Sequence, residues 1–293
     1  MPDLKAVTIT LRALPGAAET PAPPWWGRAV HALWLNVIEQ TDAELAQRIH
    51  DGSDLRPYTL SSLMGRFPQG RILADEGYRL RITTLTPELS ALLAEAIVSG
   101  PLAPGRVVTL DYHGFRVAQV DAAEGPWSGE ADYLTLAAGV LARHAAPERR
   151  IALRFVSPTG FRSRGRHVPV PLPELVFGSL LQRWNAFAPI AFPDEARRYA
   201  EESLAIARYE LRTRTVTMKN QGKRPGAVGV VSYATLNYDR YWMGVMQALA
   251  AFARFGGVGA GVTLGMGQCR VEPRERRVLT PQSQDVKEKE VQK

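Results

Sequence analysis

The sequence contains a single cysteine, Cys269, among its 293 residues. One cysteine cannot form an internal disulfide, and with no second cysteine beside it a thiolate zinc site is not expected. We interpret Cys269 as a small buried strand residue. The scattered histidines His113, His144 and His167 also lack the HExxH-like spacing of metal ligands. We therefore expect no metal site and no cofactor.

Long apolar runs are absent as well. No stretch approaches the ~18 residues that a membrane span needs. The N-terminal residues MPDLKAVTIT have neither the charged nor the apolar region of a signal peptide. We expect a protein without a membrane partner and with a cytoplasmic location.

Acidic side chains are outnumbered, with 29 Asp and Glu against 36 Lys and Arg, which gives a formal net charge of +7. This excess favours a polyanionic partner such as nucleic acid. Hydrophobic residues at 45% and charged residues at 22% are typical of a folded globular protein. At about 100 to 200 residues per domain, the length predicts two domains.

The first half of the chain has the periodicity of a ferredoxin-like domain. Apolar residues alternate in the strands and recur at helical spacing in the helices. The predicted elements are a strand at 6–13, helices at 27–38 and 41–52, strands at 55–63 and 70–85, a helix at 86–100 and a strand at 106–120. The order strand, helix, strand, strand, helix, strand is that of the ferredoxin-like fold.

The second half repeats this order after a stretch of weaker patterns at 121–148. The predicted elements are a strand at 151–156, a helix at 175–187, strands at 204–218 and 227–233, a helix at 240–255 and a strand at 262–271. The sequence thus predicts an α+β protein of two tandem ferredoxin-like (βαββαβ, RRM-like) domains, at 1–128 and 129–275. Residues 276–293 are charged and lack apolar periodicity, so we expect a disordered tail there.

A glycine-rich segment, GGVGAGVTLGMG at 256–267, holds six glycines in twelve residues. Such glycines fit a tight helix-to-strand connection, and they also fit a backbone cradle for phosphate. No Lys-Ser or Lys-Thr follows them, as a nucleotide hydrolase requires, and they do not lie between a strand and a helix, as a dinucleotide fold requires.

Residues 257–271, GVGAGVTLGMGQCRV, resemble the C-terminal signature of the CRISPR precursor-RNA processing endoribonucleases, the sixth Cas family of the RAMP superfamily. Residues 151–187 resemble the family's strand, Pro-Thr turn, basic hairpin and helix, and 226–234 its strand before the last helix. HALWLNVIEQTDAELAQRIHD at 31–51 and RPYTLSSL at 56–63 are similar to its helix pair and the strand that follows.

The resemblance implies metal-independent cleavage of CRISPR repeat RNA, which yields mature crRNA. A ribose 2′-hydroxyl attacks the adjacent phosphate and leaves a 2′,3′-cyclic phosphate and a 5′-hydroxyl. The reaction requires a base, an acid and a positive charge near the phosphoryl oxygens. Repeat RNA is the implied partner, and other Cas proteins of an effector complex or a second copy in a homodimer are further candidates.

His50 lies in the segment RIHD at the end of the second predicted helix, where the family has its catalytic histidine. Helix-end carbonyls favour a protonated ring, which suits a general acid. A histidine pKa near 6.5 suits proton transfer in either direction. The pattern by itself also fits a solvent-facing histidine that caps the helix.

Arg56 stands where the family has a basic residue ahead of its Pro-aromatic-Thr strand, and its planar fork could hold the scissile phosphate. An ordinary surface arginine fits the same pattern. Tyr58 and Ser61 on the following strand are further polar candidates.

The family's tyrosine on the first helix is replaced here by Leu35, so the role of that tyrosine as base cannot be transferred. His31 lies four residues earlier on the same helix face and is the candidate proton acceptor. A ring packed against Trp34 or Leu35 is the structural alternative for His31.

Basic residues and glycines of the second half are the candidate RNA-binding residues. No acid occurs between Arg154 and Pro173, and alternation in FRSRGRHV predicts that its three arginines point to one side of a strand or hairpin. The second basic run, from Arg212 to Arg224, also fits a charged edge strand. The full set is Arg154, Arg162, Arg164, Arg166, His167, Arg212, Arg214, Lys219, Lys223, Arg224, Gly257, Gly259, Gly261, Gly265 and Gly267.

A noncatalytic RAMP subunit, which binds guide RNA in a CRISPR effector complex, is the alternative function. It shares the fold and the glycine-rich loop with the endoribonucleases. His50 and Arg56 favour the enzyme, and the missing tyrosine favours the binding subunit.

Overall fold

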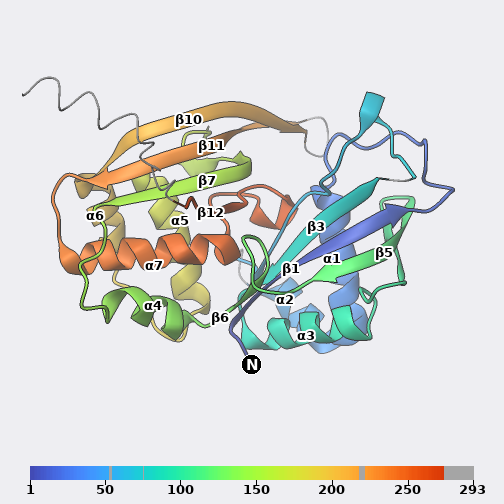
Figure 1. Cartoon of the computed structure of the whole chain (residues 1–293), viewed down its shortest axis with the longest axis horizontal. Helices are drawn as coiled ribbons and strands as arrows, with labels where there is room; N and C mark the ends of the chain where they lie inside the picture. The colour runs from blue at the N-terminus through green and yellow to red at the C-terminus, as the bar shows by residue number, and fades with distance from the viewer. Residues whose placement is uncertain (53–54, 75, 218–221, 274–293) are drawn as a thin grey trace, which may run out of the picture.

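The computed structural model describes residues 1–52, 55–74, 76–217 and 222–273. The predicted tail at 276–293 and the predicted RNA contact of Lys219 lie outside these residues. Figure 1 shows the two halves of the chain side by side, the first coloured blue to green and the second green to red.

The first half forms an antiparallel sheet in the order β2-β3-β1-β5-β4. Its strands are β1 (Leu4–Ala13), β2 (Tyr58–Leu60), β3 (Gly77–Thr84), β4 (Val107–Leu110) and β5 (His113–Asp121), and its helices are α1 (Gly27–Thr41), α2 (Ala43–Asp51) and α3 (Pro87–Val98). Alternate residues of β1, Val7, Ile9 and Leu11, are buried in one core with Val30 and Trp34 of α1.

The second half forms another antiparallel sheet in the order β10-β11-β7-β12. Its strands are β7 (Arg150–Thr159), β10 (Leu204–Thr217), β11 (Lys223–Thr235) and β12 (Cys269–Val271), and its helices are α4 (Tyr133–Leu141), α5 (Pro173–Phe187), α6 (Glu195–Ser203) and α7 (Arg240–Gly256). A separate hairpin joins β8 (Phe161–Ser163) to β9 (Arg166–Val168).

The two main sheets have the same topology. Each places the second, third, first and fourth strands of a βαββαβ unit next to one another in that order. The predicted α+β fold of two tandem ferredoxin-like domains is confirmed.

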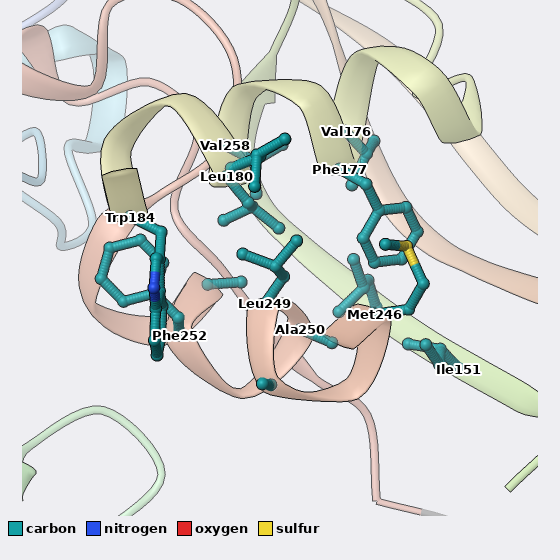
Figure 2. Close-up of a cluster of buried hydrophobic side chains, with 14 of the residues drawn as sticks. Ile151, Val176, Phe177, Leu180, Trp184, Met246, Leu249, Ala250, Phe252 and Val258 are labelled. Atoms are coloured by element: carbon teal, nitrogen blue, oxygen red, sulfur yellow. The ribbon is translucent and has the colours of Figure 1, made fainter. Parts of the chain in front are cut away.

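Helices α5 and α7 form the core of the second half. Figure 2 shows Leu180 and Trp184 of α5 facing Leu249 and Phe252 of α7. The Trp184 and Phe252 rings meet edge to face with their centroids 5.4 Å apart, a preferred aromatic geometry. Cys269 is buried, as the sequence predicts.

Several predicted elements have different limits. The strand predicted at 106–120 is a hairpin, because Asp111 has a φ of 51° and turns the chain between β4 and β5. The strand predicted at 262–271 is reduced to β12, since a 3-10 turn occupies Val262–Leu264. Helix α4 escaped prediction because its sequence, YLTLAAGVL, is apolar nearly all round and lacks a helical stripe.

The division of the chain at 128/129 stays a prediction. Strand β6 (Gly129–Ala131) follows this boundary and pairs with β1 in the first sheet. Helix α4 comes next, and its Tyr133 and Ala137 are buried in the core of the second half.

Candidate active site and nucleic-acid interface

His31 and Tyr58 form a hydrogen-bonded pair between α1 and β2. The distance from His31 Nε2 to Tyr58 Oη is 3.0 Å, and the ring centroids are 6.0 Å apart. Tyr58 also meets the ring of Trp34 edge to face. The structure thus gives His31 a polar partner, whereas the structural alternative from the sequence was a ring packed on Trp34 or Leu35.

Both members of this pair stay uncharged near pH 7. Burial lowers the pKa of half-buried His31 below 6.5, and the positive charge of Arg56 lowers it further. Burial raises the pKa of Tyr58 to about 12, against a smaller opposing effect of Arg56. A neutral imidazole keeps one ring nitrogen unprotonated, which is what a general base requires.

Arg56 connects the His31–Tyr58 pair to the end of α2. Its guanidinium donates hydrogen bonds to the carbonyl oxygen of Ile49 and, at 3.5 Å, to that of His50. Both carbonyls belong to the last turn of the helix, whose partial negative charge favours a cation there. Arg56 therefore holds the segment that carries His50 and also supplies positive charge beside His31.

His50 is exposed in the last turn of α2. The start of this helix is fixed by Asp42, whose carboxylate accepts a hydrogen bond from the Leu45 backbone N–H at 2.9 Å. The structure thus places an exposed histidine, a half-buried neutral histidine and an arginine around α1, α2 and β2. Their catalytic roles stay predictions.

The glycine-rich segment lies where the two halves meet (Figure 1, orange to red after α7). Gly257, Gly259, Gly265 and Gly267 are buried, and Gly261 is half-buried. A Cβ atom on Gly265 would lie 2.5 Å from the Ser62 backbone nitrogen. Gly265 thus packs against the first half, whereas Gly257, Gly259, Gly261 and Gly267 pack against the second half and the loop itself. Close packing explains these glycines, so a direct contact with RNA is expected only from the more exposed part of the loop.

The basic hairpin β8–β9 is exposed, but its arginines do not share one side. Arg162 lies opposite His167 and Ser163 opposite Arg166, and residues opposite each other share a face of the sheet. Arg164 lies in the turn with a φ of 49°. The prediction that the three arginines point to one side is wrong, because the turn at Arg164 reverses the chain between them.

The hairpin β8–β9 lies against the second basic run. His167 Nε2 forms a hydrogen bond with the carbonyl oxygen of Pro225 on β11. The other basic residues of this region are on β10 and β11, where Arg212, Arg214 and Lys223 are exposed and Arg224 is half-buried. The tertiary structure therefore joins two basic segments that are about fifty residues apart in the sequence.

The glycine-rich segment links this basic surface to α1 and β2. The Ala260 backbone N–H donates to the Gly160 carbonyl at 2.9 Å, just before the hairpin. On the other side, Gly265 forms an isolated bridge with Ser61, just after β2. One short loop thus contacts both the basic hairpin and the strand that carries Tyr58.

Arg154 differs from the other predicted RNA-binding residues. Its guanidinium forms a bidentate ion pair with the carboxylate of Glu272, with N···O distances of 2.5 and 2.6 Å. This pair raises the pKa of Arg154. Its charge is already matched, so the structure favours it less as a phosphate contact than the exposed arginines.

Sequence reasoning missed Trp25, Arg81 and Gln268, which join the two halves. Arg81 and Gln268 are each 3% exposed. Burial lowers the pKa of Arg81 to about 9, so it remains charged at pH 7. The alternation in the strand YRLRIT places Arg81 on the face opposite Leu80 and Ile82, so the sequence predicts an exposed arginine there and contains no signal that the second half covers it.

Among the residues that the structure describes, no group of three or more His, Cys, Asp and Glu side chains could hold a metal ion. Within the same residues, no helix is both long and apolar enough to cross a membrane.

The fold and site define a class of protein: two tandem ferredoxin-like domains with titratable side chains beside a basic surface. Comparisons identify the family. Residues 9–77 match the CRISPR Cas6 N-terminal domain, and residues 153–269 match the CRISPR-associated endoribonuclease Cas6. A Mycobacterium tuberculosis CRISPR-associated endoribonuclease Cas6 is 29% identical over 250 residues, 84% of this chain and 73% of the relative.

Solved structures agree with the family match. A Cas6 product complex is 31% identical with a TM-score of 0.73, covering 92% of this chain and 99% of that chain. A Thermus thermophilus Cas6 is 27% identical with a TM-score of 0.67, covering 93% and 99%. The chain belongs to the Cas6 family of CRISPR-associated endoribonucleases, and the family recognised from its glycine-rich signature is confirmed.

Proposed function

We propose that this chain cleaves CRISPR repeat RNA without a metal ion to produce mature crRNA. In this reaction the ribose 2′-oxygen forms a bond to the adjacent phosphorus while the bond to the 5′-oxygen breaks. The products carry a 2′,3′-cyclic phosphate and a 5′-hydroxyl. Similarity to Cas6 proteins solved as product and substrate-mimic complexes supports an RNA substrate.

The observation that carries the proposal is the link from His31 through Arg56 to His50. Neutral His31 accepts the proton of the 2′-hydroxyl, and Tyr58 holds its ring through the 3.0 Å hydrogen bond. Exposed His50 donates a proton to the leaving 5′-oxygen. The Arg56 guanidinium donates a hydrogen bond to the His50 carbonyl oxygen at 3.5 Å, its positive charge acts on His31, and it stabilises negative charge on the phosphoryl oxygens.

The RNA on either side of the cut binds the basic surface of the second half. The exposed side chains of Arg162, Arg166 and Arg212 supply phosphate contacts. The glycine-rich loop carries this surface next to β2, so RNA held by the hairpin is delivered to the histidines.

The test is cleavage of candidate repeat RNAs in excess EDTA by wild type, His50→Ala and His31→Ala. We expect wild type to give a cyclic phosphate product and each variant to be slower by about 100- to 10,000-fold, the usual contribution of a proton-transfer group. His144→Ala is the matched control, since His144 is exposed in a loop after α4.

We expect wild type not to cleave a substrate that has a 2′-deoxy nucleotide at the cut. Cleavage of that substrate would contradict attack by the 2′-hydroxyl. Tight binding of repeats without any cleavage by wild type would instead favour the noncatalytic RNA-holding subunit.

A further inference from the structure

Gln268 uses all four of its polar groups to join the two halves of the molecule. Its backbone N–H donates to Ser157 Oγ at 2.9 Å, and its backbone carbonyl accepts from the Val156 N–H at 2.9 Å. These contacts fix it to the second half. Its side-chain Nε2 donates to the Leu60 carbonyl at 3.0 Å, on the strand that carries Tyr58.

Arg81 on β3 completes this junction. Its Nη1 donates to Gln268 Oε1 at 2.8 Å, and its other nitrogens donate to the carbonyl oxygens of Trp127 and Arg254, each at 2.5 Å. These three acceptors of the buried guanidinium are neutral oxygens. A buried charge of this kind persists where the surrounding structure holds every acceptor in place.

The same junction also fixes the start of α1, the helix that carries His31. Trp25 Nε1 donates to the Leu264 carbonyl at 2.7 Å. A Cβ atom on Gly27, the first residue of α1, would lie 1.8 Å from that carbonyl oxygen. The second half therefore contacts both elements between which the His31–Tyr58 hydrogen bond forms.

We propose that Gln268 and Arg81 are positioning residues that hold α1 and β2 so that His31 and Tyr58 meet in the geometry of the reaction. Neither residue is exposed enough to contact RNA. The inference rests on the proposed function for its effect on cleavage. Its structural part, the geometry of the His31–Tyr58 pair, is independent of RNA.

The test replaces Gln268 with methionine, which preserves most of the side-chain volume and removes both side-chain hydrogen bonds. Gln182→Met is the matched control, because Gln182 is exposed on α5. The first readout is an NMR titration of His31, assigned with His31→Ala. Among the residues that the structure describes, two titratable groups interact with His31. Tyr58 on β2 forms a hydrogen bond with its ring, and the positive charge of Arg56, just before β2 in the chain, lowers its pKa.

We expect the His31 pKa to lie below 6.5 in wild type and Gln182→Met and to rise toward 6.5 in Gln268→Met as the ring gains water. The second readout is single-turnover cleavage together with the Kd for repeat RNA. The rate should fall at least about tenfold, since a misplacement of about 1 Å can cost ~100-fold. The Kd should stay within about twofold of wild type, because the basic surface is unchanged.

A purely structural role would lower the unfolding temperature without moving either readout. Wild-type His31 titration and cleavage rate in folded Gln268→Met would overturn the proposal. If Gln268→Met does not fold, Trp25→Phe removes the hydrogen bond to Leu264 together with part of the indole ring and is judged by the same two readouts.

The experiment distinguishes a failure of the proposed function from a failure of the positioning proposal. If wild type cuts no repeat RNA, that function is overturned, and the His31 titration alone decides the positioning. A shifted pKa in Gln268→Met then supports it, and an unchanged pKa overturns it.

Discussion

At the scale of single residues, burial rather than sequence context sets the chemistry of the two candidate histidines. His50 is exposed at a helix end, whereas His31 is half-buried against Tyr58 and near Arg56. Burial and the nearby positive charge of Arg56 lower the pKa of His31, which favours the neutral ring that its proposed role as a base requires.

The lowered pKa of His31 also makes stability depend on pH. In the unfolded chain the ring has its ordinary pKa near 6.5, so below that pH the unfolded state binds the proton more readily than the folded state. The contribution of His31 to stability is complete above pH 6.5 and is lost as pH falls through its lower folded pKa. We therefore expect His31→Gln to lose less stability than wild type between pH 7.5 and pH 5, measured by urea unfolding. His144→Gln should follow wild type, and an equal loss in His31→Gln would contradict the buried neutral ring.

At the scale of elements, the glycine-rich segment packs closely against the backbone of both halves of the molecule. Gly265 has a φ of 89° and leaves no room for a Cβ beside Ser62. A phosphate cradle would need exposed backbone amides, and most of these glycines are buried. Glycine content in the sequence therefore reports the close approach of two backbones.

Gly105→Ala is a matched comparison for Gly265→Ala. Gly105 has nearly the same φ, 88°, with nothing within 4 Å of an added Cβ. We expect Gly105→Ala to cost about 1–3 kcal/mol from backbone strain alone. Gly265→Ala should cost about 1–3 kcal/mol more, because the added methyl meets the Ser62 backbone. Urea unfolding of the two variants measures the difference in free energy of unfolding. Equal losses of stability would show that the Ser62 backbone moves aside for the added methyl group without a cost in free energy.

At the scale of the whole molecule, the chain has a net charge of +7, and the fold brings two of its basic segments together on one surface. The β8–β9 hairpin and the tip of β10–β11 come together through His167 and Pro225. Arginines on such a surface neutralise phosphates, and RNA binding then weakens with added salt as counterions are released less favourably.

Salt dependence of RNA binding tests this surface. Removing one phosphate contact should lower the slope of log K against log salt by about 0.7 to 0.9. We expect this change for Arg162→Gln, measured by filter binding or anisotropy between low and moderate salt. Arg198→Gln is the control, since Arg198 is exposed on α6 and pairs with Glu202 at 3.8 Å. Equal slopes for Arg162→Gln and wild type would remove Arg162 from the interface.

Periodicity in the sequence determined the fold class and the βαββαβ order of both halves, because strands and helices have different spacings of buried side chains. The glycine-rich signature determined the family. Local sequence also placed His50 at a helix end and Arg56 just after it, since both depend on neighbours close in the chain.

Only the tertiary structure decided which distant residues meet. The pairing of His31 with Tyr58, the burial of the glycines, and the contact of Gln268 with Arg81 and Leu60 arise between segments that are far apart in the chain. Sequence patterns report the face on which a side chain lies. They do not report which face of another element will cover it, and that choice sets burial, charge and pKa at this site.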